Sequence, residues 1–304
     1  MADHRFTELP ALLTPGDLVV VNHTRVRPAR LHGIKSGTGG GVEMLLLRRL
    51  EDPRWEAMVR PARRVRAGMR LEFGPITAEV VTNPVEGVVE VAVQADIDVE
   101  DAIEAAGEVP LPPYITTPLA DPDRYQTMFA ERPGSSAAPT AGLHFTPAVV
   151  DGLGRNGVDL ASVELDVGLA TFRPITTEHV EDHVMHRERC RVPPAAADAI
   201  ARCRARSGRV VAVGTTVVRT LETFRLPGGL VEPGECETEL YLTPGSDIGV
   251  VDLLVTNFHL PRSSLLVLVE AFMGAGWREV YAAALERGYR FLSFGDVMLC
   301  AGDR

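Results

Sequence analysis

The sequence lacks a long hydrophobic run and a secretory start. Its longest apolar stretch, "LLVLVEAFMG" at residues 265–274, is short and contains Glu270. A membrane-spanning helix needs about 20 apolar residues. The opening "MADHRFTELP" has no basic segment followed by an apolar one. We therefore expect a cytoplasmic protein with no membrane partner.

Cysteines are few, and the cysteines and histidines do not have the spacing of a typical zinc site. The four cysteines are scattered and include no C-x-x-C pair: Cys190, Cys203, Cys236 and Cys300. The segment "HVEDHVMHRERC" contains His183, His186 and Glu188, and on a helix its two histidines would share a face. Zinc sites usually need a third or fourth protein ligand. We therefore predict no metal. General acid/base work by His186 or Glu188 is the better functional interpretation, and a polar surface cluster is the alternative.

Positive charge is scarce overall but concentrated in one region. The net charge of −10 argues against a protein that coats nucleic acid non-specifically. Residues 20–75 nevertheless hold twelve Lys and Arg against five Asp and Glu. Five of these arginines fall within residues 60–70: Arg60, Arg63, Arg64, Arg66 and Arg70. Such a cluster is either a solvated face or a surface that contacts the phosphates of a nucleic acid.

The pattern of hydrophobic residues changes along the 304-residue chain. Up to about residue 95, short apolar segments broken by Gly, Pro or Asn predict a small antiparallel barrel or sandwich. Later segments alternate between helix and strand, which indicates an α/β domain with a largely parallel sheet. We expect helices over 146–157, 195–208, 215–224, 261–276 and 277–288, and strands over 158–168, 209–214 and 251–258.

Ligands of open α/β sheets bind beyond the carboxyl ends of the strands. After the strand "RVVAVG", Gly214 leads to Thr215 and Thr216 at a helix start, where exposed N–H groups can hold an anion or simply be capped. Arg219, one turn later, could reinforce an anion site or face solvent.

The segment "VTNFHLPRSS" repeats this arrangement after the next predicted strand. Asn257, Phe258 and His259 follow the strand, and Pro261 stands near the start of a helix. The alternative is a half-buried structural histidine beside an asparagine turn.

A long segment rich in Pro and Gly, residues 111–147, separates the two patterns. Its aromatic residues favour an ordered binding loop, and it ends in "AAPTAGLHFTP". Thr146 is a predicted helix cap and Pro147 the first helical residue. His144 thus lies close to a helix N-terminus, which lowers histidine pKa and favours the neutral ring of a base.

These segments closely resemble the S-adenosylmethionine:tRNA ribosyltransferase-isomerase family of queuosine biosynthesis. The resemblance is carried by "NHTRVRPARL", "GEVPLPPYI", "DRYQTMFAERPGSSAAPTAGLHFT", "VGLATFRPI", "HVMHRERCRV", "VGTTVVRTLE", "VDLLVTNFHLPRSSLLVLVEAF" and "YRFLSFGDVML". It implies an α/β main domain, residues 1–25 and 106–304, with an inserted small antiparallel β-barrel domain, residues 26–105. It also implies transfer and isomerisation of the ribosyl part of S-adenosylmethionine onto 7-aminomethyl-7-deazaguanine in tRNA, giving epoxyqueuosine-tRNA, adenine and methionine.

This chemistry needs bases at the 5′ carbon beside the sulfonium and at the attacking amine. The candidates for these proton transfers are His144, His186, Glu188 and His259. We assign S-adenosylmethionine binding to Thr140, Phe145, Gly214, Thr215, Thr216, Arg219, Asn257 and Phe258. Among these, the two phenylalanines could face the sulfonium, and the turn from Gly214 to Thr216 with Arg219 could hold the methionine carboxylate. We assign tRNA phosphates to Arg25, Arg60, Arg63, Arg64 and Arg66.

The sequence also departs from the family pattern. Asp166 and Ala170 stand where the family usually has His and Gly, His23 where it has Asp or Asn, and Cys190 where Tyr is common. The family normally begins with a further few tens of residues, so we expect a divergent or N-terminally shortened member. Two alternatives to the tRNA enzyme follow: the same ribosyl chemistry on a small 7-deazapurine or amine, or a catalytically silent RNA- or nucleoside-binding protein.

Overall fold

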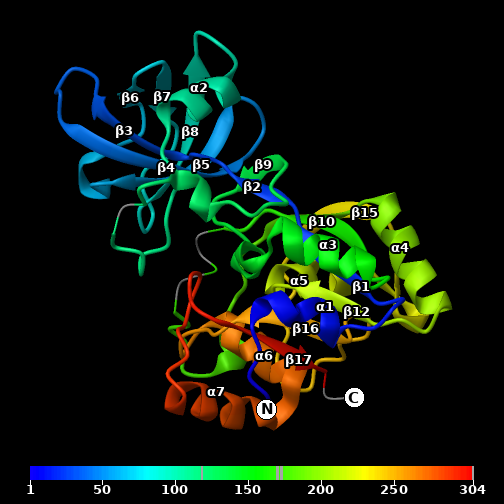
Figure 1. Ribbon diagram of the computed structural model, residues 1–304. Coiled ribbons are helices and arrows are strands. Elements are labelled where there is room, and N and C mark those ends of the chain that lie inside the picture. Colours follow the sequence, from blue (N-terminus) through cyan, green and yellow to red (C-terminus); the bar gives the residue numbers. More distant parts are fainter. Residues whose placement is uncertain (118, 169–170, 172–173, 303–304) are drawn as a thin grey trace. The chain divides into compact units, whose positions relative to one another are not determined.

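A computed structural model describes residues 1–117, 119–168, 171 and 174–302 of the chain (Figure 1). These residues form two compact units. The first contains residues 1–25, 123–133 and 138–304, and the second contains residues 26–122 and 134–137. The second unit thus extends to Pro122, beyond the predicted limit at residue 105. None of the described helices is long and apolar enough to cross a membrane.

A seven-stranded sheet forms the centre of the first unit, in the order β15-β11-β10-β1-β12-β16-β17. The four middle strands are parallel: β10 (Asp159–Leu165), β1 (Leu18–Asn22), β12 (Val210–Val213) and β16 (Leu253–Asn257). The three outer strands are antiparallel to their neighbours: β15 (Gly234–Thr238), β11 (Glu188–Val192) and β17 (Val297–Ala301). The prediction of a largely parallel sheet therefore holds for the middle of the sheet and not for its margins.

Helices cover this sheet, so every residue of β1, β12 and β16 is buried. Val19 and Val21 pack with α1 (Leu9–Leu12) and α3 (Pro147–Arg155) in one core cluster. Side chains alternate along a strand, so Leu18 and Val20 face the other way. The remaining helices are α4 (Pro194–Ala205) and α5 (Thr215–Thr223), which both contact β1, and α6 (Ser264–Met273) and α7 (Trp277–Glu286).

The start of α3 is the predicted one, whereas α6 begins at Ser264, three residues after its predicted start at residue 261. The Thr146 hydroxyl accepts a hydrogen bond from the backbone N–H of Val149, and Pro147 is the first residue of α3. Ser263 caps α6 in the same way through the N–H of Leu266. Each cap satisfies a backbone donor that would otherwise lack a partner at the helix end.

The second unit contains a closed barrel in the order β3-β4-β5-β8-β7-β6, all antiparallel. Its strands are β3 (Arg30–Lys35), β4 (Gly41–Arg49), β5 (Arg54–Arg60), β6 (Arg70–Phe73), β7 (Ile76–Val80) and β8 (Val88–Ala95). The helix α2 (Val99–Ala106), capped by Asp98, contacts β7 and β8. The barrel confirms the first of the two architectures expected for this region, and the fold class is the predicted one.

Short elements complete the described part of the chain. They are the strands β2 (Thr24–Val26), β9 (Arg132–Ser135), β13 (Arg225–Leu226) and β14 (Leu230–Val231), and the single-turn helices η1 (Phe6–Glu8), η2 (Ala62–Arg64), η3 (Pro122–Tyr125), η4 (Thr140–His144), η6 (Val180–Asp182), η7 (Pro227–Gly229) and η8 (Gly274–Gly276).

Candidate active site

The parallel strands bring several predicted site segments to one edge of the sheet. β1, β10, β12 and β16 run in the same direction, so the residues that follow Asn22, Leu165, Val213 and Asn257 lie at one edge. Glu188 begins β11, which is antiparallel to β10, and therefore lies at the same edge. This is where ligands of α/β sheets bind.

A short hydrogen-bond chain holds His144. The Thr140 hydroxyl donates to Oδ1 of Asn257 over 2.9 Å, and Nδ2 of Asn257 lies 3.2 Å from Nε2 of His144. An amide nitrogen can only donate, so Nε2 accepts this hydrogen bond. The neutral imidazole then carries its proton on Nδ1. The structure thus brings together three predicted site residues from two distant segments.

Burial lowers the pKa of His144, while Asp296 raises it and Arg290 lowers it by smaller amounts. The ring of Phe6 lies 5.5 Å from the imidazole, centre to centre. The predicted direction of the pKa shift is therefore found, but burial is its main cause in place of the α3 N-terminus. A histidine that is neutral at pH 7 can act as a base.

The two phenylalanines predicted to face a sulfonium lie in the protein interior. Phe145 is 4% exposed, and its ring packs edge-on against Phe6 at 5.0 Å and Phe129 at 5.4 Å. Phe258 is 1% exposed and stacks on Phe291 at 5.2 Å, with Tyr281 edge-on at 5.4 Å. In this arrangement both rings stabilise the core beneath the site.

His259 has the surroundings of a structural histidine. Its Nε2 lies 2.9 Å from the Thr256 hydroxyl, and its backbone N–H donates to the Tyr281 hydroxyl over 3.0 Å. Burial lowers its pKa to about 4. The ring is therefore neutral at pH 7, and its position favours the structural interpretation of this residue.

Glu188 and Arg219, predicted to have separate roles, form a buried ion pair. They are 4% and 5% exposed. The other carboxylate oxygen of Glu188 accepts hydrogen bonds from the N–H of Gly168 over 2.8 Å and the hydroxyl of Thr171 over 2.9 Å. The Arg219 Nε donates to the carbonyl of Leu240 over 3.0 Å. Glu188 thus neutralises Arg219 and anchors a neighbouring loop.

The start of α5 offers polar groups beside this pair. Gly214 adopts φ of +92°, a backbone conformation that L side chains rarely adopt, and Thr215 and Thr216 occupy the first two helical positions. Among the described residues, Oγ1 of Thr216, Nη2 of Arg219 and the hydroxyl of Tyr241 are buried and have no hydrogen-bond partner. All three residues line a cavity of about 20 Å³, room for one water molecule. A polar group of a ligand could satisfy them.

The two histidines considered for a metal site do not share a helix. Residues 183–187 are irregular and follow the single turn η6. His186 is exposed, whereas the half-buried ring of His183 packs edge-on against Tyr241 at 5.5 Å. Burial lowers the pKa of His183, and the charge of His186 lowers it further. Within the described ranges, no group of three His, Cys, Asp or Glu side chains could hold a metal ion.

The predicted tRNA-binding arginines lie in both compact units. Arg60, Arg63, Arg64 and Arg66 are exposed on the second unit, at the end of β5, in η2 and two residues after it. The Arg66 guanidinium donates to the carbonyls of Arg63 and Val65 over 3.0 and 2.7 Å, which holds it along the backbone. Arg25, in β2, belongs to the first unit.

One charged cluster was missed in the sequence. Glu164 in β10 is 1% exposed and accepts hydrogen bonds from Arg132 (2.9 Å), Arg189 (3.2 Å) and Arg191 (2.8 Å), while His23 lies 3.4 Å away. Burial raises the pKa of Glu164, but the hydrogen bonds from Arg132 and Arg191, together with the nearby His23, outweigh it and lower the pKa overall. The alternating arginines of "RERCRV", residues 187–192, were the signal in the sequence for this cluster. The sequence did not show that β10, which carries Glu164, would be the neighbouring strand.

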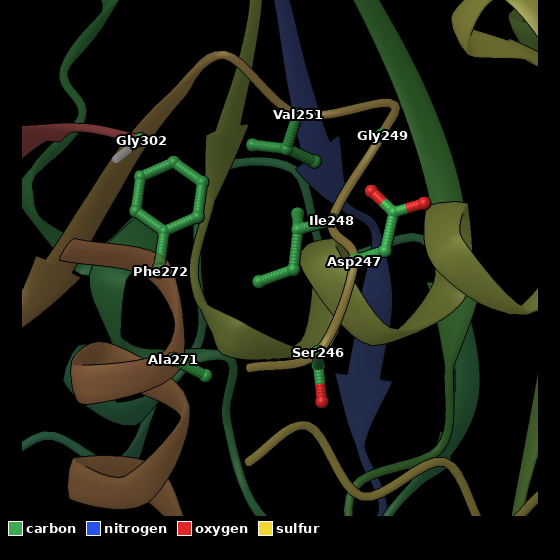
Figure 2. A pocket seen from close by; sticks show the side chains of 8 residues that line it. All are labelled: Ser246, Asp247, Ile248, Gly249, Val251, Ala271, Phe272 and Gly302. Carbon is green, nitrogen blue, oxygen red and sulfur yellow. The ribbon is translucent and has the colours of Figure 1, made fainter. Parts of the chain in front are cut away.

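Another pocket, of about 270 Å³, lies between the loop at residues 246–251, α6 and the end of β17. Figure 2 shows the apolar side chains of Ile248, Val251 and Phe272 facing one another there. Its ionisable lining residue, Asp247, is paired with Arg225 at 2.8 Å. Most of the side chains that line it are apolar and its carboxylate is already paired, so the carboxyl edge of the sheet is the better candidate for the active site.

Three of the positions that depart from the family pattern, His23, Asp166 and Cys190, lie around the same edge. Asp166 follows β10, and one of its oxygens lies 3.6 Å from Nη1 of Arg189. Cys190 is buried opposite Cys236 on β15, with 3.8 Å between the sulfur atoms. Ala170 lies outside the described residues.

Comparisons with known proteins agree on one family. The sequence model described as "Queuosine biosynthesis protein" matches residues 1–300. The S-adenosylmethionine:tRNA ribosyltransferase-isomerase of Moorella thermoacetica is 50% identical over 98% of this chain and 88% of its own length. The enzyme of the same name from Natranaerobius thermophilus is 46% identical over 97% and 87%. The crystal structure of S-adenosylmethionine tRNA ribosyltransferase from Thermotoga maritima is 36% identical, covers 96% of this chain and 85% of its own, and aligns with a TM-score of 0.50.

Proposed function

The chain belongs to the queuosine biosynthesis protein family, and from that premise we propose that it converts tRNA with S-adenosylmethionine as co-substrate. It is an enzyme, an S-adenosylmethionine:tRNA ribosyltransferase-isomerase. The observation that carries this conclusion is the identity of 45–50% to enzymes of that name over nearly the entire chain. The acceptor is 7-aminomethyl-7-deazaguanine in tRNA, and the products are epoxyqueuosine-tRNA, adenine and methionine. Because the substrate is tRNA, the reaction takes place in the cytoplasm.

His144 is the base that removes the proton from the 5′ carbon beside the sulfonium. Its lowered pKa keeps the ring neutral, and Thr140 and Asn257 orient it. The geometry favours His144 over His259, because His144 is only half-buried whereas His259 is buried. Nε2 of His144 takes the proton when its hydrogen bond from Asn257 opens. The exposed His186 is the remaining histidine for deprotonating the attacking amine or protonating adenine.

The start of α5 holds the methionine carboxylate of S-adenosylmethionine. Gly214, Thr215 and Thr216 present the helix N-terminus, where anions are favoured. Arg219 contributes a hydrogen-bond donor there, while Glu188 balances its charge. Glu188 is therefore a positioning residue for Arg219 rather than a free base, and Phe145 and Phe258 support the site from the core.

The acceptor is tRNA rather than a small amine, because the names of the relatives specify tRNA. The exposed Arg60, Arg63, Arg64 and Arg66 contact its phosphates, with Arg25 on the other unit. These contacts position the nucleic acid and do not read its bases.

The test is to incubate the protein with S-adenosylmethionine and tRNA that carries the aminomethyl base, and to quantify adenine and methionine. The control is the same tRNA with guanine at that position. We expect release only with the modified tRNA. Release with a free 7-deazapurine or a small amine alone would contradict the tRNA acceptor, and binding without any release would contradict the enzyme assignment.

A further inference from the structure

A pocket of about 500 Å³ adjoins the turn that carries His144, and none of the roles above uses it. Leu143 and Phe145, the two chain neighbours of His144, both line it. The other lining residues are Asp123 and Arg124 of η3, the residues Gln126, Thr127 and Met128 just after it, and Phe294. All of these residues belong to the first unit. The volume is within the range of small-molecule sites, about 300–1,000 Å³.

One wall of the pocket is a fixed aromatic ring. Tyr125, which is fully buried, packs edge-on against Phe294 at 6.3 Å. The guanidinium of Arg124 lies 5.8 Å from the centre of the Phe294 ring. Aromatic rings and guanidinium planes are the groups on which proteins stack unpaired bases. The pairing of the two here therefore fits a planar heteroaromatic ligand.

A hydroxyl without a partner lies in the same lining. Thr127 is 5% exposed, and among the described residues its Oγ1 makes no hydrogen bond. Its methyl group faces Gly142, where an added Cβ would lie 3.0 Å from Cγ2 of Thr127. Packing thus fixes this side chain, and an unsatisfied buried hydroxyl is costly unless a ligand or water meets it.

We propose that this pocket binds a fused bicyclic nucleobase, stacked against Phe294 and hydrogen-bonded to Thr127. A phosphate or an amino acid would leave the apolar wall of Leu143, Phe145 and Phe294 unused, whereas a base uses both the ring and the hydroxyl. This inference rests on the proposed function, which supplies two such bases: the adenine of S-adenosylmethionine and the 7-deazaguanine of tRNA. Either base would lie beside the turn that presents His144.

The experiment measures binding without turnover, by calorimetry. The first probe is S-adenosylhomocysteine, which has the adenosyl group but no sulfonium. The second is an anticodon stem-loop RNA with the aminomethyl base, compared with an abasic stem-loop. The variants are Thr127→Val, which keeps the packed methyl group and removes the hydroxyl, and Phe294→Leu. The matched controls are Thr127→Ser, which keeps the hydroxyl, and Phe272→Leu in the pocket of Figure 2.

We expect Phe294→Leu to raise the Kd of one probe at least fivefold, Thr127→Val to raise it about three- to tenfold, and both controls to change it less than twofold. If only the binding of S-adenosylhomocysteine weakens, the pocket holds the adenine of the adenosyl group. If only the binding of the stem-loop weakens, the pocket holds the 7-deazaguanine of tRNA. Unchanged binding of both probes, or an equal loss in Phe272→Leu, overturns the proposal.

The same variants separate this inference from the proposed function. If the wild-type protein releases adenine with modified tRNA while both pocket variants bind both probes normally, the pocket assignment alone is wrong. If the wild-type protein releases no adenine but the pocket variants bind one probe more weakly, the assignment of the base pocket is supported and the proposed reaction is wrong.

Discussion

The Glu188 carboxylate and the Arg219 guanidinium face each other in the protein interior, one at the start of β11 and the other on α5. Removing one partner of a buried ion pair typically costs about 3–5 kcal/mol, because the other charge is left buried without compensation. The pair therefore couples the outer, antiparallel part of the sheet to the helix that begins at the carboxyl edge.

We expect Glu188→Gln to lower the free energy of unfolding by roughly 3 kcal/mol. Urea denaturation would measure this, with Arg219→Gln and the double variant completing a cycle. The double variant should cost much less than the sum of the two single changes. The exposed pair of Arg206 and Asp159 is the control: Asp159→Asn should cost less than about 1 kcal/mol. If the losses of unfolding free energy in the two single variants added up to the loss in the double variant, the two residues would not be energetically coupled.

His144→Ala should lower kcat for adenine release by about 100- to 10,000-fold, the range of a lost general base. Binding of S-adenosylhomocysteine should change little, because the side chain acts on the proton and not on the ligand's affinity. A circular dichroism spectrum and an unfolding curve would confirm that the variant is folded. Unimpaired turnover would remove His144 from the mechanism.

The pH dependence of kcat/KM should reflect a neutral His144. Because burial lowers the pKa of His144 from 6.5, activity should persist as the pH falls through 6.5 and be lost only below it. Asn257→Asp places a carboxylate 3.2 Å from Nε2 and should raise that pKa, so the acid limb of the profile moves to higher pH. A variant profile that overlays the wild type would exclude His144 as the titrating base.

Stability should fall in acid because of His259. Its pKa is about 4 in the folded protein and 6.5 in the unfolded chain, so the unfolded state takes up a proton first as the pH falls. The stabilisation is complete above pH 6.5 and is lost progressively down to about pH 4. The difference corresponds to roughly 3 kcal/mol. Urea unfolding at several pH values would show this slope reduced in His259→Gln and unchanged in His32→Gln, a residue 55% exposed.

Binding of tRNA should weaken steeply with salt, and replacing Arg63, Arg64 and Arg66 by alanine should flatten that dependence. Each lost phosphate contact reduces the slope of log K against log salt by roughly 0.7–0.9. Arg278→Ala, at a residue 62% exposed on α7, is the control and should leave the slope unchanged. An unchanged slope in the triple variant would place the tRNA elsewhere.

The sequence alone determined the local elements and the chemistry available to them. Cap residues such as Thr146 mark helix starts, and Gly214 marks a turn, because these features depend on neighbours in the chain. The alternation of strand and helix indicated the parallel strands, and thereby the edge at which His144 and Asn257 were expected to act.

Only the tertiary structure decided which side chains meet. His144 and Asn257 are 113 residues apart, and Glu188 and Arg219 are 31 apart. Their contacts depend on the strand order, which is set by the burial of whole faces and not by any local pattern. The same non-local packing placed Phe145, Phe258 and His259 in the core. It also surrounded Glu164 with three arginines that the sequence left unassigned.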